Sequence, residues 1–93
     1  MQTGRRTVTA SAAKIFTTET AERCDVGIQI FASSGNTADI YVSSESTITA
    51  NSNDDTDGYP IQAGEKLLIT ERTPNYLYAV APTGSQTMWF IIQ

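Results

Sequence analysis

A single pattern of strand, glycine-containing turn and strand occurs twice in this chain of 93 residues, at 28–42 and at 77–91. The first copy reads IQIFASSGNTADIYV and the second reads LYAVAPTGSQTMWFI, with Gly35 and Gly84 at equivalent positions. In each copy an alternating apolar run leads into a short polar turn and a second alternating run. Such runs around a glycine turn are typical of β-hairpins. The sequence therefore predicts two hairpins and, with them, an all-β protein.

Strand-like segments also lie outside the repeat, and no segment has the periodicity of an amphipathic helix. We expect strands near residues 6–16, 26–32, 39–42, 47–50, 66–71, 76–81 and 87–92, although ASAAK in the first segment could form a helical turn. Short strands with turn signals every 8–12 residues are typical of sandwiches and barrels. The chain length favours one domain. We therefore predict an all-β fold, a small antiparallel β-sandwich, jelly-roll-like, with six to eight strands over residues 6–93 and a flexible N-terminal arm at 1–5.

The alternation also predicts which side chains face the core. In the first copy it places Ile28, Ile30, Ile40 and Val42 inward. Aligning the second copy without a gap places Leu77, Ala79, Trp89 and Ile91 inward, and Met88, Phe90 and Ile92 outward. The outward residues Phe31, Tyr41 and Phe90 are then more apolar than a lone soluble domain needs, so we expect them at a contact between subunits.

The composition excludes several kinds of chemistry. The chain has no histidine, which removes the commonest general base and metal ligand, and Cys24 is the only cysteine, so no intrachain disulfide can form. The net charge of −4 argues against binding to nucleic acid. No apolar run approaches the roughly 20 residues that span a membrane, and the start of the chain lacks the apolar segment of a signal peptide. We expect no catalytic residues, no cofactor, no metal and no membrane partner.

Two features leave the binding of a small ligand open. Residues 53–58, NDDTDG, match the beginning of a calcium-binding EF-hand loop, but Gly64 occupies the position of the last ligand and Pro60 follows closely. A solvated acidic turn is therefore favoured for residues 51–58, and a weak calcium site stays as the alternative. The aromatic residues Tyr41, Tyr59, Tyr76, Tyr78 and Trp89 could instead form a platform for a sugar.

From Val8 to its end the chain resembles small virion surface proteins of tailed bacteriophages, the decoration or cement proteins of the head. The segments that carry the resemblance are Val26–Ala32, Asp39–Val42, Gly58–Ile69, Tyr76–Gly84 and Met88–Ile92. The resemblance implies a β-sandwich without a cofactor that assembles as a homotrimer on the outer surface of the capsid. It also implies that the partner is the major capsid protein and that the chain is made in the cytoplasm of the host bacterium.

We therefore expect a non-enzymatic bacteriophage virion structural protein that decorates and stabilises the capsid by binding the outside of capsomers. The residues expected at the subunit or capsid interface are Phe31, Tyr41 and Phe90 together with Gln2, Arg5 and Arg6 of the arm, as a tether to an acidic capsid surface. The alternatives are another virion component, such as a head fibre, tail or adaptor protein, and a carbohydrate-binding module.

Overall fold

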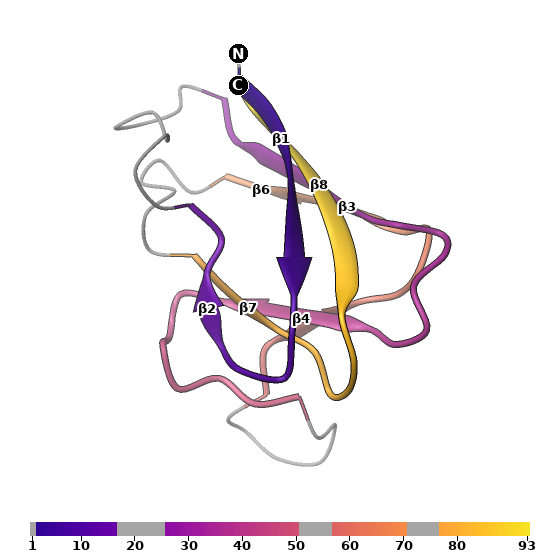
Figure 1. Cartoon of the computed structure of the whole chain (residues 1–93). Coiled ribbons are helices and arrows are strands. Elements are labelled where there is room, and N and C mark those ends of the chain that lie inside the picture. Colours follow the sequence, from indigo (N-terminus) through magenta and orange to yellow (C-terminus); the bar gives the residue numbers. More distant parts are fainter. Residues whose placement is uncertain (1, 17–25, 51–56, 71–76) are drawn as a thin grey trace.

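The computed structural model describes residues 2–16, 26–50, 57–70 and 77–93, which form strands and no helix (Figure 1). Its strands are β1 (Gln2–Val8), β2 (Ala13–Lys14), β3 (Ile28–Ala32), β4 (Ile40–Ser43), β5 (Tyr59–Ile61), β6 (Lys66–Ile69), β7 (Tyr78–Val80) and β8 (Gln86–Ile92). Four strands in the order β1-β8-β3-β6 build sheet I, and four in the order β2-β7-β4-β5 build sheet II. The prediction of a small antiparallel β-sandwich with six to eight strands is therefore confirmed. Within the described ranges no helix is long and apolar enough to cross a membrane.

The strand order is that of a jelly roll. The first strand pairs with the last, β2 with β7, β3 with β6 and β4 with β5, all antiparallel. The chain is thus a long two-stranded ribbon that folds back over itself. Two further antiparallel pairs, β3 with β8 and β4 with β7, join the folded ribbon into its two sheets. This is the arrangement of two Greek keys that defines a jelly roll.

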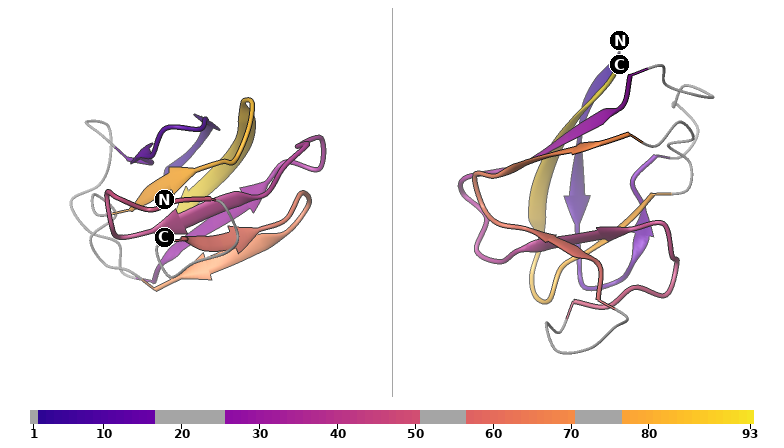
Figure 2. Two further views of the ribbon diagram at one scale, coloured as in Figure 1. Left: turned by 90° about the horizontal axis from the view of Figure 1, so that it is seen from below. Right: turned by 180° about the vertical axis from the view of Figure 1, so that it is seen from behind.

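The prediction that each copy of the repeat forms a β-hairpin is wrong. β3 and β4 come from the first copy of the repeat, but β3 lies in sheet I and β4 in sheet II (Figures 1 and 2). The same holds for β7 and β8 of the second copy. Each glycine-containing turn therefore crosses from one sheet to the other. The strands of one copy pair with those of the other copy, because β3 pairs with β8 and β4 with β7.

Side-chain hydrogen bonds hold the two turns together at the place where the chain crosses between the sheets. The side-chain amide of Asn36 accepts a hydrogen bond from Thr87 N at 2.8 Å and donates one to Thr87 O at 2.9 Å. Gln86, which is 2% exposed, accepts from Thr37 N at 2.9 Å and donates to Thr83 O at 2.9 Å. Asn36 thus joins the first turn to β8, and Gln86 of β8 joins the first turn to the second.

The core lies between the sheets and contains most of the residues that alternation predicts. Ile28, Ile30 and Ile40 are fully buried, and Val42, Leu77 and Ala79 are at most 5% exposed, as expected. Phe16 packs edge-on against Phe90 with ring centroids 4.7 Å apart. The prediction is wrong for β8, where Met88, Phe90 and Ile92 are buried, Ile91 is half-buried and Trp89 is 47% exposed.

The register of β8 explains this reversal. Ile92, Phe90 and Met88 pair directly with the buried residues Ile28, Ile30 and Ala32 of β3. Residues that face each other across an antiparallel pair point to the same side of the sheet, so the three β8 residues point into the core. Along the chain, buried Ile40 follows buried Ala32 by eight positions, whereas buried Met88 follows buried Ala81 by seven. An alignment without a gap therefore assigned β8 to the wrong face.

Residues 2–5 belong to the domain rather than to an arm outside it. β1 begins at Gln2 and pairs with β8 along its whole length, from Gln2 opposite Ile92 to Val8 opposite Gln86. Gly4 lies opposite Phe90, and a Cβ atom at Gly4 would lie 2.6 Å from the Cζ atom of that ring. The glycine therefore allows β1 to lie against the core beside Phe90. The predicted arm is corrected to an edge strand of sheet I.

Candidate binding surface

The outer faces of the two sheets differ in how they are covered. On sheet II, Tyr41 and Val80 pair with each other on the face away from the core, yet they are only 5% and 4% exposed. Ile48, from the segment that follows β4, packs against both and is itself 6% exposed. Ala12, Ala50 and Tyr78 surround this small cluster. Tyr41 and Val80 on the outer face of sheet II are therefore covered by another segment of the chain.

Sheet I presents an uncovered outer face. One row of side chains crosses all four strands, because Arg5 pairs with Trp89, Trp89 with Phe31, and Phe31 with Lys66. We call these four residues the aromatic row. A second row consists of Thr3, Ile91, Gln29 and Leu68. We call the eight residues of both rows the open face; within it Leu68 is 56% and Trp89 is 47% exposed.

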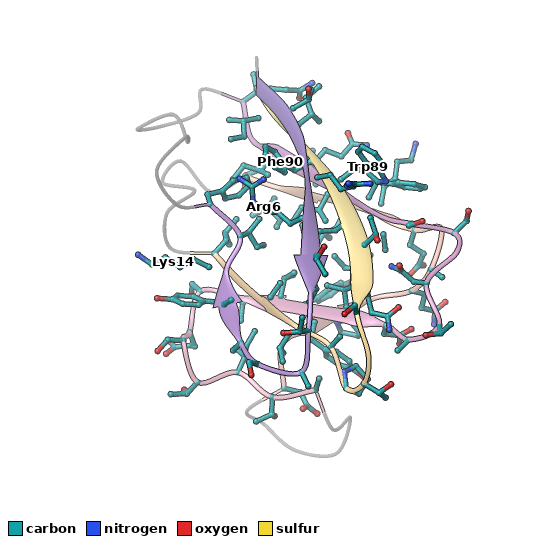
Figure 3. The ribbon with its side chains drawn as sticks, in the orientation of Figure 1. Arg6, Lys14, Trp89 and Phe90 are labelled. Atoms are coloured by element: carbon teal, nitrogen blue, oxygen red, sulfur yellow. The ribbon has the colours of Figure 1, made fainter. Side chains whose placement is uncertain are left out.

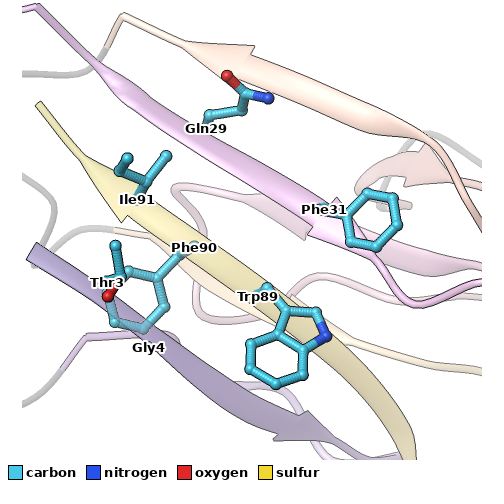
Figure 4. A pocket seen from close by; sticks show the side chains of 7 residues that line it. All are labelled: Thr3, Gly4, Gln29, Phe31, Trp89, Phe90 and Ile91. Carbon is cyan, nitrogen blue, oxygen red and sulfur yellow. The ribbon is translucent and has the colours of Figure 1, made fainter.

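A shallow hollow of about 330 Å³ lies on this face (Figure 4). Its lining comes from β1, β8 and β3, and consists of Thr3, Gly4, Gln29, Phe31, Trp89, Phe90 and Ile91. The guanidinium carbon of Arg5 lies 5.5 Å from the ring centroid of Trp89, at the distance of a cation–π contact. Apolar side chains thus form the floor of the surface, and a cation is held over its largest ring.

The charges of the open face have one sign. Arg5 and Lys66 stand at the two ends of the aromatic row, and none of the other six residues is charged. Neighbouring strands lie about 4.8 Å apart, so three spacings separate the two Cα atoms by about 14 Å. The whole chain carries a net charge of −4. The open face is therefore a positive area on a negative protein.

The structure brings together only two of the six predicted interface residues, Arg5 and Phe31, with Trp89 between them. Arg6 points to the opposite side of β1, where its Nε donates to Ile15 O at 2.7 Å and its guanidinium lies 5.0 Å from the Phe90 ring.

The other three predicted residues are placed elsewhere. Phe90 is in the core and Tyr41 is covered on sheet II. Gln2 is the first residue of β1, and its side chain lies outside the described part of the chain. Phe90 and Tyr41 therefore do not offer the exposed contact that we expected of them.

Sequence reasoning did not assign the other apolar and charged residues of the open face to an interface. The alignment of the two copies placed Trp89 and Ile91 inward, although Trp89 was also considered for a sugar platform. Lys66 and Leu68 belong to no motif that indicates a binding site. The pairing of β8 with β3 was the signal needed, because buried Ile28 and Ile30 fix Ile92 and Phe90 inward and so turn Trp89 outward.

The described tyrosines do not gather around Trp89. Tyr41, Tyr59 and Tyr78 lie in strands of sheet II, whereas Trp89 lies in sheet I, and Tyr76 is outside the described residues. The five-residue aromatic platform considered from the sequence is thus not assembled by the four members whose positions are described.

The acidic loop falls mostly outside the described residues, which omit 51–56 and also Cys24. Asp57, at its end, accepts a hydrogen bond from Thr49 Oγ1 at 2.7 Å. In the described ranges no three side chains of His, Cys, Asp or Glu are grouped so that they could hold a metal ion. Calcium binding by residues 51–58 stays a prediction.

The open face therefore has the properties of a contact surface: exposed aromatic and aliphatic side chains, a shallow shape, and cations at its ends. Its eight residues include no carboxylate, thiol or imidazole. The chain matches no protein-family model, no curated protein and no solved structure.

Proposed function

We propose that this chain is a non-enzymatic structural protein of a bacteriophage virion, which decorates and stabilises the capsid by binding the outside of capsomers as a homotrimer. The observation that carries this proposal is the open face of sheet I. Exposed apolar side chains that gather on one sheet face, such as Trp89 and Leu68, indicate a place where another protein binds. The resemblance of the sequence to head decoration proteins specifies which kind of partner to test first.

The fold is compatible with this role but does not decide it. Jelly rolls occur in viral capsid domains and also in lectins and cupins, so the function has to be argued from the surface. A standard contact buries about 800 Å² on each partner, which is roughly a seventh of the 5375 Å² that this chain exposes. One open sheet face is large enough for a substantial part of such a contact. Symmetric copies on a capsid would add their separate contacts through avidity.

The test uses heads of the phage that encodes this chain, prepared so that they lack this protein. Purified protein is mixed with these heads, and the bound fraction is measured by co-sedimentation over a range of concentrations. We expect saturable binding to the outer surface. Light scattering on the free protein is expected to give about three times the 10.1 kDa mass of one chain. Absence of binding contradicts the capsid role, and a strictly monomeric protein contradicts the trimer.

Carbohydrate binding is a second candidate because exposed Trp89 and half-buried Phe31 lie side by side on one face. Rings of this kind also stack on sugars, so adding glycans would change the fluorescence of Trp89, the only tryptophan of the chain. Another position in the virion, such as a head fibre, tail or adaptor, is distinguished by the number of copies per particle. Labelling of the protein in intact virions locates it directly.

A further inference from the structure

We infer that the aromatic row is the capsid-binding site and that its partner is a protein surface on which carboxylates flank an exposed apolar residue. This inference rests on the proposed function and goes further, because it names the residues that bind and the chemistry they recognise. The apolar partner residue would lie on Trp89 and Phe31, and the carboxylates would reach Arg5 and Lys66.

The charges of the aromatic row determine which sign of charge the partner surface must carry. Arg5 and Lys66 stand at its two ends, and the other residues of the open face are uncharged. A partner with cations at these positions would be repelled, whereas carboxylates would form charge-assisted hydrogen bonds. The separation of about 14 Å between the two Cα atoms leaves room for one apolar side chain between two acidic ones.

The aromatic part supplies the area that such a contact buries. Trp89 is 47% exposed and has Phe31 directly beside it in the row. Arg5 is already stacked over the Trp89 ring at 5.5 Å, so less side-chain freedom is lost when a partner binds. Tryptophan and arginine are the residues most enriched where binding energy concentrates in protein contacts. These two residues are therefore expected to contribute most of the affinity.

A second open face is a poor occupant of the same surface. Every charged group on the open face is positive, so two open faces brought together would place cations against cations. In a trimer the open face of one copy would instead meet a different surface of the next copy. The oligomeric state of the Lys66→Glu protein therefore distinguishes a contact between copies from a contact with the capsid.

The experiment compares charge reversals at matched lysines of the two sheets. Lys66 and Lys14 are both exposed strand residues, but Lys14 is in β2 of sheet II and projects away from Trp89 (Figure 3). Lys66→Glu and Lys14→Glu change the net charge equally. Binding of each variant to heads that lack the protein is measured by co-sedimentation at about 50 mM and about 500 mM NaCl, since salt screens exposed charge pairs.

We expect Lys66→Glu to weaken binding by about tenfold or more in low salt and Lys14→Glu by less than about twofold, with the difference shrinking in high salt. A second pair tests the ring: Trp89→Ala is expected to weaken binding by about tenfold or more, and Tyr59→Ala, which removes a 62% exposed ring on sheet II, by less than about twofold.

Three results would overturn the inference, and they differ in what else they affect. Equal binding by Lys66→Glu and Lys14→Glu, while the unchanged protein binds heads, overturns the inference and leaves the proposed function standing. If the Lys66→Glu protein binds poorly and light scattering shows that it has also lost its oligomeric state, the open face forms contacts between copies, and the inference is wrong. An unchanged protein that does not bind heads overturns the proposed function and the inference together.

Discussion

The two copies of the repeated pattern, 28–42 and 77–91, begin alike and end on opposite faces of their strands. In both, the first strand places alternate apolar residues in the core, ending at Ala32 in one copy and at Ala81 in the other. After the turn, the next buried apolar strand residue comes eight positions after Ala32 in the first copy and seven positions after Ala81 in the second. Similar patterns therefore constrain the strands well and the connections between them poorly. A single position in the connection decides whether Trp89 is buried or exposed.

The copies also differ in how their turns are built. Gly84 has a φ of 65°, in the left-handed region, whereas Gly35 is not among the glycines with positive φ. Thr37 and Gln86 occupy equivalent positions and hydrogen-bond to each other, through Thr37 N to Gln86 Oε1 and Gln86 Nε2 to Thr37 Oγ1. The two copies are therefore not separate units, because each depends on the other for its strand partners and for the polar contacts of its turn.

The largest expected effect tests the face assignment within β8 of the second copy. Phe90→Ala removes a core ring that packs against Phe16, and we expect it to lower the free energy of unfolding by about 3–5 kcal/mol. Trp89→Ala, one position earlier, removes a ring that is 47% exposed, and we expect a loss of about 1 kcal/mol or less. Urea unfolding followed by circular dichroism measures both. The opposite ranking would restore the inward Trp89 predicted by the repeat alignment.

The next effect concerns the contact between the two turns. Gln86→Ala leaves Thr37 N and Thr83 O without their partner in a site where the glutamine is 2% exposed. We expect a loss of about 2–3 kcal/mol in the free energy of unfolding, because the variant loses three hydrogen bonds of the Gln86 side chain, each worth about 1 kcal/mol. Ser85→Ala, at an exposed neighbouring position, is the matched control and should change stability little. Equal effects in the two variants would show that the turns do not depend on each other.

Asn36 tests the same contact from the first copy. Its amide pairs with both backbone groups of Thr87, so Asn36→Ala is expected to cost about 1–2 kcal/mol. Hydrogen exchange should locate the loss, because the amide of Thr87 would become less protected. If the Thr87 amide keeps its protection, the side chain is not what joins the two turns.

The smallest effect separates the two equivalent glycines. Gly84→Ala places a Cβ atom in a left-handed conformation and is expected to destabilise the protein by about 1 kcal/mol. At Gly35 an added Cβ would meet only Ser33 Oγ, at 3.8 Å, so Gly35→Ala is expected to be neutral or to stabilise by about 0.5 kcal/mol. Thermal unfolding of both variants resolves the difference. Identical midpoints would mean that the two turns are conformationally equivalent after all.

Prediction from sequence succeeded where the alternation of apolar and polar residues was unambiguous. Ile28, Ile30 and Ala32 alternate with more exposed neighbours, and the structure buries all three. Prediction failed where both faces are apolar, as in β8, because alternation then gives no direction. The open face was therefore predicted only in part. Arg5 and Phe31 were expected at an interface, but the repeat alignment assigned Trp89 to the core. No sequence pattern pointed to Lys66 or Leu68 as binding residues.

The amino-acid pattern was enough to predict an all-β chain, strands near 26–32, 39–42, 66–71, 76–81 and 87–92, and the inward residues of β3 and β4. The strand pairing, the buried face of β8 and the open face of sheet I became visible only in the folded molecule. The cause of this division is the range of the interactions. Alternation is a local property of neighbouring residues, whereas pairing depends on contacts such as that of Asn36 with Thr87, which join segments far apart in the chain.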